Sequence, residues 1–282
     1  MNKLGVPFIA CTFFITIGSS SVHAAAVDLS TWTTESYPAV SGFGSGVWTV
    51  SDDVVAGDNG KVVQSVNGQP TFFYSDFDTF GSLFTSNITV SGGDDDYIGF
   101  ALGFNPGDST NPAADYLLID WKKGTQTHNF GAPSNTPGST AFSGLSVSRV
   151  TGIPTADEFW GHVDFDHASS PLGQGLDELQ RGATLGNTGW TIVTTNEFTF
   201  DFGPNDLEIF VNGTLELDIA GLFNNGRFAF YNFSQAGVTY AGLEQDSGSF
   251  PPLNPIPVPA AFWLFGTALV GLVGFSKRRK AV

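Results

Sequence analysis

Alternation of apolar and polar side chains is the feature that most limits how this chain can fold. In the segment 196–202, Phe198, Phe200 and Phe202 stand at every second position, with polar residues between them. Successive side chains of a β-strand point to opposite faces of the sheet, so this spacing predicts a strand with one buried face. The same alternation recurs through the middle of the chain, separated by residues that favour turns.

The clearest hairpin surrounds Asn212-Gly213, which separates the alternating segments 207–211 and 215–219. Asn-Gly favours the type I′ turn that joins two adjacent antiparallel strands. Further strands are expected at 46–50, 71–77, 83–90, 97–104, 115–121, 145–150 and 227–233.

Helix signals are weak in the same region. We find no amphipathic segment of useful length, and only Leu176 to Gln180 is expected to form a turn or two of helix. The residues 25–253 therefore predict one all-β domain, either an antiparallel sandwich or a barrel.

The N-terminal residues 1–24 have the three parts of a secretory signal peptide. Lys3 is followed by an apolar run, and the segment ends in small residues at Ala24. This arrangement predicts that the chain is exported and that the segment is then removed.

The C-terminal residues 254–282 predict a membrane-spanning helix. The run 260–275 is uncharged and mostly apolar, and a basic cluster containing Arg278 and Arg279 follows it. A helix of this length reaches about 24 Å, slightly less than the ~30 Å hydrocarbon core of a bilayer. The basic cluster favours the cytoplasmic side, which places the rest of the chain outside.

The order of proline motif, apolar span and basic end also resembles a PEP-CTERM sorting signal. The residues that carry this resemblance are Pro257, Val258, Pro259, Trp263, Leu264, Phe265, Gly266, Arg278 and Arg279. The chain departs from the usual pattern at Val258, where glutamate is commonest. The resemblance implies that an exosortase recognises the tail and that the protein reaches the cell surface or the exopolysaccharide matrix. A plain membrane anchor is the alternative.

Charge and cysteine content exclude several classes of function. With 27 acidic and 11 basic residues the chain carries a formal net charge of −16, which argues against nucleic acid as a partner. Such a surface attracts divalent cations, among which calcium takes carboxylate oxygens readily. The single cysteine excludes a disulfide scaffold and a cysteine-based zinc site.

Two segments resemble the C-terminal lectin-like domain of thrombospondins. They are Asp94–Phe104, continued by Asp115–Lys122, and Gly226–Gln235, with Phe159 to His162 and Gly189-Trp190 between them. The cysteines that pair in that family are missing here. The resemblance implies a concanavalin-like antiparallel β-sandwich of the jelly-roll type, calcium bound at acidic loops, and a role in adhesion or matrix association.

Three adjacent carboxylates, Asp94, Asp95 and Asp96, precede the apolar segment 97–104. A solvated loop is the simple interpretation, and adjacent side chains of an extended chain alternate in direction, so two at most converge on one ion. The thrombospondin resemblance nevertheless implies a calcium site here, completed by carbonyl oxygens or a distant carboxylate. The weaker candidates for a metal site are Asp76 with Asp78 and Asp164 with Asp166.

Glycoside hydrolases with concanavalin-like folds align acidic residues on alternate positions of one strand. Glu216 and Asp218 begin such a pattern, but Ala220 and Gly221 stand where the second glutamate belongs. Glu208 is able to approach Glu216 across the hairpin, although exposed polar faces explain both more simply. We therefore expect no enzymatic activity.

Together these patterns predict an exported, calcium-binding, lectin-like protein that associates with exopolysaccharide or another matrix component. Trp121 or Trp160, if they point away from the core, would stack on sugar rings. A structural matrix or sheath protein without a specific ligand is the alternative, and a divergent glycoside hydrolase is a more remote one.

Overall fold

The computed structural model describes residues 25–40, 42–131, 137–165 and 175–246. The signal peptide expected at 1–24 and the sorting tail expected at 254–282 lie outside these residues, as does Asp166. In the described part of the chain, no helix is long and apolar enough to cross a membrane.

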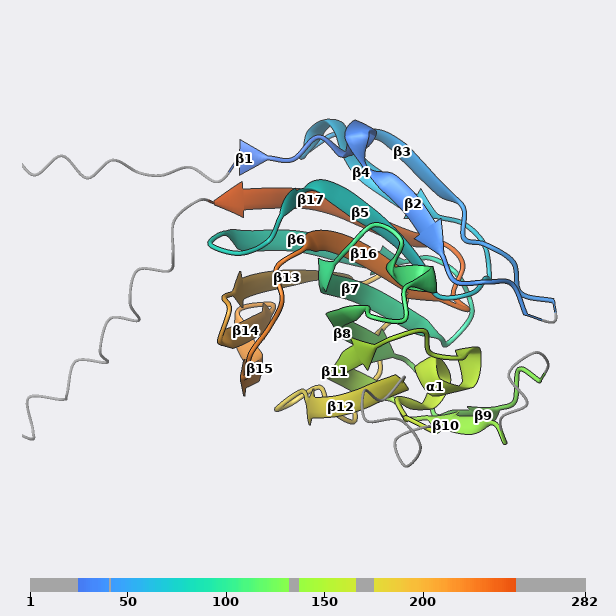
Figure 1. Ribbon diagram of the computed structural model, residues 1–282. Helices are drawn as coiled ribbons and strands as arrows, with labels where there is room; N and C mark the ends of the chain where they lie inside the picture. The colour runs from blue at the N-terminus through green and yellow to red at the C-terminus, as the bar shows by residue number, and fades with distance from the viewer. Residues whose placement is uncertain (1–24, 41, 132–136, 166–174, 247–282) are drawn as a thin grey trace, which may run out of the picture.

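Two large antiparallel sheets form the sandwich (Figure 1). The first, in spatial order, contains β15 (Thr214–Ala220), β14 (Asp206–Val211), β13 (Thr195–Phe202), β6 (Leu83–Val90), β17 (Val238–Asp246), β4 (Gly57–Gln64) and β3 (Trp48–Asp53), with β1 (Ala25–Ala26) paired to β17. The second contains β12 (Gly175–Arg181), β11 (Gly144–Thr151), β8 (Asp115–Lys122), β7 (Tyr97–Phe104), β16 (Arg227–Phe233), β5 (Thr71–Asp78) and β2 (Thr33–Ser36). The predicted all-β antiparallel sandwich is therefore confirmed.

Phenylalanine rings fill the space between the two sheets. Phe100 on β7 lies 5.0 Å from Phe198 and 4.7 Å from Phe200 on β13, measured between ring centroids. Phe228 on β16 lies 5.0 Å from Phe84 on β6. The face predicted from the alternation at 198, 200 and 202 is thus the face that the core buries.

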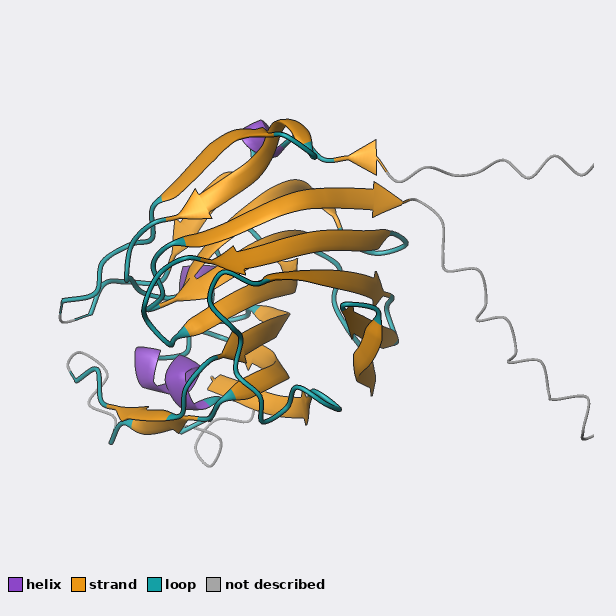
Figure 2. Ribbon diagram, turned by 180° about the vertical axis from the view of Figure 1, so that it is seen from behind, coloured by secondary structure: helices purple, strands orange, loops and turns teal. Residues whose placement is uncertain are grey.

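A second apolar layer covers the outer face of the second sheet, so that β7 is buried along its whole length. The helix α1 (Ala156–Gly161) packs there beside the short hairpin of β9 (Gln126–His128) and β10 (Ser139–Ala141) (Figure 2). The short 3₁₀ turns Leu29–Thr31 and Asp108–Thr110 complete the regular structure. Residues of this layer line two cavities of the protein.

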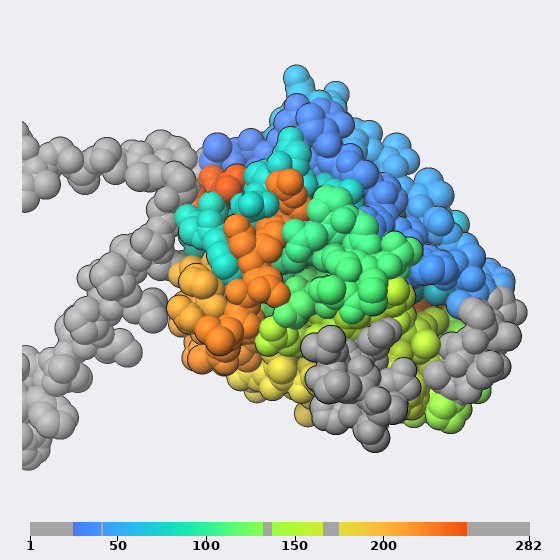
Figure 3. Space-filling model, viewed as in Figure 1, coloured from blue at the N-terminus to red at the C-terminus, as the bar shows by residue number. Residues whose placement is uncertain are grey.

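The two ends of the described chain pair with each other at the C-terminal end of β17. β1 pairs with β17 through Ala25 and Ala26, and the space-filling view shows the N-terminal segment in blue against the C-terminal strand in red-orange (Figure 3).

The predicted turn at Asn212-Gly213 is confirmed, with φ of 50° and 77° as a type I′ turn requires. The prediction of a helical turn at Leu176 to Gln180 is wrong, because these residues lie in β12, where Leu176 pairs with Val150 of β11. Cross-strand pairing overrides the local preference of leucine and glutamate for helix.

The helix that does form begins at a capping box. The hydroxyl of Thr155 accepts from the backbone N–H of Glu158 at 3.2 Å, and the carboxylate of Glu158 accepts from the backbone N–H of Thr155 at 2.7 Å. This reciprocal pair satisfies two amides that a helix start leaves without partners. Its sequence signature, threonine followed three residues later by glutamate, was present in the chain.

Replacing Val193 is expected to stabilise the protein. It has a φ of 59° and is 76% exposed, so its branched side chain gains little burial while its backbone lies in the left-handed region. That conformation costs a non-glycine residue about 1–2 kcal/mol, and asparagine tolerates it better. Val193→Asn should raise the free energy of unfolding by about 1 kcal/mol in urea denaturation.

Val54 provides the matched control, because it is fully exposed and is not among the residues with positive φ. Val54→Asn should leave stability within about 0.5 kcal/mol of the native value. If both substitutions have the same effect, backbone strain at Val193 is not the cause.

Candidate functional site

A cavity of about 180 Å³, which we name the Asp94 cavity, lies at the edge of the second apolar layer. Its wall combines carboxylates, amides and aromatic rings from segments far apart in the sequence. The lining residues are Phe43, Asn67, Asp94, Asp96, Gln126, His128, Phe130, Trp160 and Ser234.

The structure brings the three predicted carboxylates together. One oxygen from each of Asp94, Asp95 and Asp96 lies within 4.8 Å of the others, and no other such group of acidic, histidine or cysteine residues occurs in the described parts of the chain. The carboxylate of Asp94 accepts from Asn67 Nδ2 at 2.7 Å and from the backbone N–H of Asp95 at 3.0 Å. Asp94 and Asp96 face the cavity, and Asp95 does not line it.

A buried ammonium group lies against this acidic cluster. The Lys122 side chain is 0% exposed, and its Nζ lies 2.7 Å from Asp96 Oδ1 and donates to the backbone carbonyl of Asp95 at 2.8 Å. The same Nζ lies 3.6 Å from the carboxylate of Asp95 and 4.6 Å from the ring centroid of Trp160. Lys122 therefore supplies a positive charge to the acidic loop from within the protein.

Asp96 is held from several sides. Its backbone N–H donates to Gln235 Oε1 at 3.1 Å, and its carbonyl accepts from Trp190 Nε1 at 2.9 Å. Burial raises the pKa of Asp96 above its usual value, while the hydrogen bond and charge of Lys122 and a hydrogen bond from Ser234 oppose that rise. These contacts hold Asp96, which lines the cavity, in position.

Gly124 allows the chain after β8 to approach the acidic loop. A Cβ at this position would lie 2.3 Å from a carboxylate oxygen of Asp95, which is too close for any other residue without rearrangement. The backbone amides of Lys123 and Gly124 both donate to the carbonyl of Asp95, each at 3.2 Å. The turn following β8 thus braces the loop that carries Asp94 and Asp96.

Aromatic rings form another part of the wall. His128 lies 4.4 Å from Phe130 and 6.0 Å from Trp160, and Phe43 lies 5.2 Å from Phe130, all between ring centroids. Trp160 Nε1 donates to the carbonyl of Gln126 at 3.1 Å, which fixes the indole against β9. His128 and Phe43 are partly exposed, so ring surface is accessible at the mouth of the cavity.

Trp121 and Trp160, which would stack on sugar rings if they pointed away from the core, are both buried. Trp121 packs between the sheets and donates to the carbonyl of Thr188 at 2.6 Å. Trp160 is 2% exposed and belongs to the second apolar layer, although it borders the Asp94 cavity. The alternating pattern did not reveal that the second sheet is covered on both faces.

The structure separates the acidic residues considered for hydrolysis. Glu216 is 2% exposed, and its carboxylate accepts from the backbone N–H groups of Thr184 at 2.8 Å and Leu185 at 3.0 Å, and from the Thr184 hydroxyl. The interpretation of Glu216 as part of an exposed polar face is therefore wrong, because a bulge in β15 turns it inward. Asp218 is exposed and lies opposite Glu208, so these two do not share an environment with Glu216.

The weaker metal candidates do not form comparable clusters in the described residues. Asp76 and Asp78 lie on exposed positions of β5, and Asp78 forms an ion pair with Arg227 at 3.2 Å. Asp164 is described but its predicted partner Asp166 is not.

A second buried charged group is centred on His162, immediately after α1. Its Nε2 lies 3.0 Å from Asp120 Oδ2, and its Nδ1 lies 3.4 Å from Glu178 Oε2. Burial alone would lower the pKa of His162, but the two carboxylates outweigh it and raise the pKa to about 9. The imidazolium is thus an internal ion-pair partner that ties α1 to the second sheet.

No known family model matches this chain, and no curated protein matches it in sequence. Among solved structures, it is similar to the carbohydrate-binding module CBM66 from Bacillus subtilis, at 12% identity over 76% of this chain and 94% of that one, with a TM-score of 0.47. A Bacillus subtilis protein of unknown function with a galectin-like fold matches at 10% identity over 80% of this chain and 95% of that one, with a TM-score of 0.41.

The Caenorhabditis elegans galectin LEC-6 matches at 12% identity over 66% of this chain and 96% of that one, with a TM-score of 0.36. At these identities and TM-scores, the matches say nothing of the ligand that this chain binds.

Proposed function

We propose that this protein is a lectin-like carbohydrate-binding protein and that the Asp94 cavity holds one sugar residue of its glycan. The observation that carries the proposal is the pairing of carboxylates and amides with accessible aromatic rings in one cavity. A site that orients a small ligand combines apolar surface with a few fixed polar groups in this way. The volume of about 180 Å³ suits a single sugar ring.

The acidic, amide and aromatic residues of the wall each have a distinct role in binding. Sugar hydroxyls donate to the carboxylate of Asp94, which already accepts from Asn67 and is partly exposed. The amides of Asn67 and Gln126 offer both donors and acceptors. The apolar face of the sugar ring packs on Phe43 and His128 at the mouth.

The charge of the cavity favours a neutral sugar. Lys122 compensates Asp96, whereas the hydrogen-bond partners of Asp94 are a neutral amide and a backbone N–H. The whole chain also carries a formal net charge of −16, so an anionic polysaccharide would be repelled.

Calcium at Asp94 to Asp96 stays a prediction, and the geometry narrows it. Carboxylate oxygens suit calcium, but Lys122 Nζ already lies 2.7 Å from Asp96 Oδ1. A divalent ion bound to that oxygen would repel the ammonium. Lys122 Nζ also lies 3.6 Å from the carboxylate of Asp95, so the ammonium would oppose a calcium ion at either residue. Glycan binding is therefore proposed without a requirement for calcium.

The cellular part of the proposal rests on the predicted ends of the chain. A signal peptide at 1–24 and a PEP-CTERM-like tail containing Pro257, Val258, Pro259, Arg278 and Arg279 would export the protein and present it to an exosortase. The glycan partner would then be a neutral exopolysaccharide at the cell surface or in the matrix, and the role would be adhesion or matrix association without catalysis.

Asp94→Ala is expected to weaken retention on neutral exopolysaccharide roughly 10- to 100-fold, because a hydrogen bond to a charged group contributes about 1.5–3 kcal/mol. The measurement is affinity electrophoresis of the full chain in gels containing the polysaccharide. Asp76→Ala is the control, because it removes an exposed carboxylate on β5 that does not line the Asp94 cavity, and it should leave retention unchanged. The melting temperatures of both variants should equal the native value.

Repeating the electrophoresis with calcium and then with EDTA tests whether glycan binding requires calcium. Retention that EDTA abolishes would make calcium part of the site. Failure of the native chain to bind any neutral glycan would contradict the proposal and favour the structural matrix or sheath protein.

A further inference from the structure

Asn67, which lines the Asp94 cavity, is followed directly by Gly68. In an Asn-Gly pair the backbone nitrogen of glycine is able to attack the side-chain amide of asparagine, because glycine has no Cβ to hinder the approach. The chain contains four such pairs, at Asn59-Gly60, Asn67-Gly68, Asn212-Gly213 and Asn225-Gly226. Which of them reacts depends on how firmly the fold holds each asparagine.

Three of the pairs are held firmly. Asn59 lies within β4, and its backbone N–H donates to Asp52 Oδ1 at 3.0 Å. Asn212 and Asn225 are held through both ends of the side chain, since each Oδ1 accepts from a backbone N–H at 3.0 Å and each Nδ2 donates to a side-chain oxygen. The attack requires the asparagine to rotate about its backbone and side-chain bonds, so these contacts oppose it.

Asn67 is held by a single side-chain contact. It is exposed and lies outside the strands, and its Nδ2 donates to Asp94 Oδ2 at 2.7 Å. Among the described residues, neither Asn67 Oδ1 nor the backbone N–H of Gly68 has a hydrogen-bond partner. The attacking nitrogen and the carbonyl group that it attacks are thus both without a competing bond, and the carboxylate of Asp94 lies against the nitrogen that would leave.

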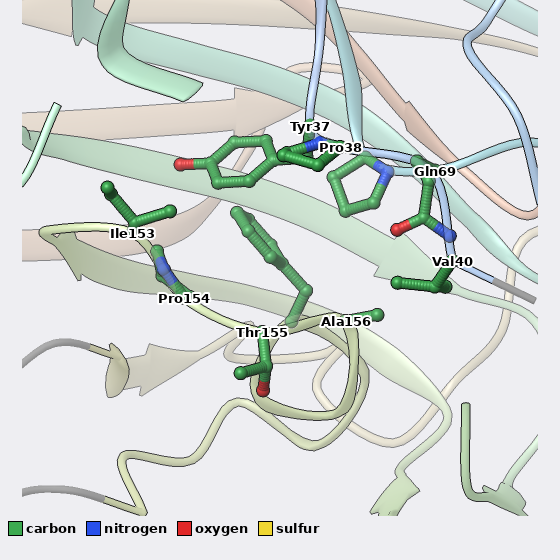
Figure 4. A pocket seen from close by; sticks show the side chains of 10 residues that line it. Tyr37, Pro38, Val40, Gln69, Ile153, Pro154, Thr155 and Ala156 are labelled. Atoms are coloured by element: carbon green, nitrogen blue, oxygen red, sulfur yellow. The ribbon is translucent and has the colours of Figure 1, made fainter. Parts of the chain in front are cut away.

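The fold also requires glycine at position 68. A Cβ there would lie 2.7 Å from the carbonyl oxygen of Gly44. The carbonyl of Gly68 accepts from the backbone N–H of Ser234 at 2.9 Å, and the N–H of Gln69 donates to the carbonyl of Gly44 at 2.8 Å. The Gln69 side chain lies in the wall of a cavity of about 270 Å³, near Val40 (Figure 4). The chain that follows the asparagine is therefore anchored, and the residue that makes the pair reactive is not replaceable without rearrangement.

We propose that Asn67 is a site of spontaneous deamidation, and that its deamidation inactivates the Asp94 cavity. The backbone nitrogen of Gly68 loses its proton to solvent and bonds to Asn67 Cγ, and Nδ2 takes up a proton and leaves as ammonia. The product is a five-membered succinimide. Water then opens the ring at either of its two carbonyl groups and gives aspartate or isoaspartate, so the net reaction consumes one water molecule and releases one ammonia molecule.

Both products change the wall of the Asp94 cavity in the same direction. Each places a carboxylate where the amide of Asn67 donated to Asp94, so a hydrogen bond is lost and two like charges meet. Isoaspartate also lengthens a backbone that is anchored at Gly68 and Gln69. The loss of glycan binding rests on the proposed function, whereas the modification itself does not.

Peptide mapping by mass spectrometry tests the modification on the full chain, incubated at mildly alkaline pH in water enriched in heavy oxygen. The peptide that contains Asn67 should gain aspartate and isoaspartate several times faster than the peptides of the other three pairs. Aliquots of the same sample, run by affinity electrophoresis on neutral exopolysaccharide, should lose retention at the rate at which Asn67 is modified. Asn67→Gln is the matched control, because it keeps an amide whose longer side chain disfavours ring closure, and its retention should stay constant during the incubation.

Asn67→Asp gives the product without incubation. It should weaken retention about tenfold relative to the fresh native chain, with the melting temperature preserved. Modification at Asn67 that is no faster than at the other pairs would overturn the inference, as would complete deamidation with unchanged retention. A fresh native chain that binds no neutral glycan would instead contradict the proposed function, and the mass spectra alone would then decide whether Asn67 is the modification site.

Discussion

Replacing Lys122 with methionine is expected to lower the free energy of unfolding by about 3–5 kcal/mol. The ammonium is fully buried and lies 2.7 Å from the carboxylate of Asp96, whose side chain is 5% exposed. Methionine preserves most of the volume but leaves that carboxylate without its ion-pair partner, and an uncompensated buried charge is strongly destabilising. Urea denaturation at neutral pH, followed by circular dichroism, measures the loss.

Two further variants isolate the charge from the packing. Lys123→Met is the matched control, because Lys123 is partly exposed and its Nζ lies 5.1 Å from the Trp190 ring centroid, so the change should cost about 1 kcal/mol or less. Lys122→Met combined with Asp96→Asn should recover part of the stability, since neither buried charge then remains. If Lys122→Met costs no more than Lys123→Met, the buried pair does not hold the acidic loop.

The sheets were largely predictable because their side chains alternate. Every strand expected from the sequence overlaps an observed one, and β6, β7 and β16 have the predicted bounds. Alternation is a local property that follows from strand geometry, so it can be recognised in the sequence whichever strands become neighbours.

The strands that sequence patterns missed depend on partners distant in the chain. β4 begins with Gly-Asp-Asn-Gly, a composition typical of a turn, and becomes a strand by pairing with β3 and β17. β17 contains Gly242 with a φ of 63°, where its register with β6 shifts. Neither property is visible in the residues of the strand itself.

The candidate site was predictable only in its acidic half. Asp94 to Asp96 stand out as adjacent carboxylates, whereas Asn67, His128 and Trp160 come together through tertiary packing. The position of Lys122 in the sequence is also unusual, but no role in the site was predicted for this residue. It is a lysine at the end of the mostly apolar strand β8, and a lysine that is buried requires an acidic partner.

A loss of stability in mildly alkaline solution is expected from His162. Its pKa is about 9 in the folded protein, against about 6.5 for an unperturbed histidine, because Asp120 and Glu178 together outweigh the effect of burial. A raised folded-state pKa contributes stability that is fully present below pH ~6.5 and is lost as the pH rises through about 9. The difference in pKa corresponds to about 3 kcal/mol.

The groups that face the imidazole come from several strands. Asp120 lies on β8, Glu178 on β12, and Ser146 Oγ on β11 lies 3.3 Å from Nδ1, while the Tyr97 ring on β7 lies 5.2 Å away. Burial would raise the pKa of Glu178, but His162 and then Arg181, which lies 2.7 Å away, together lower it below its usual value. Histidine is therefore the group in this cluster that titrates between pH 6.5 and 9.

The experiment measures the free energy of unfolding from pH 6 to pH 10 for the native chain and for His162→Gln, which keeps a donor but cannot become charged. The native curve should fall by about 3 kcal/mol relative to the variant curve as the pH passes through 9, because only the native chain loses an ion pair. Both curves should share any slope that arises from other groups. Parallel curves would mean that His162 is already neutral at pH 7 and that α1 is held to the second sheet by packing and hydrogen bonds alone.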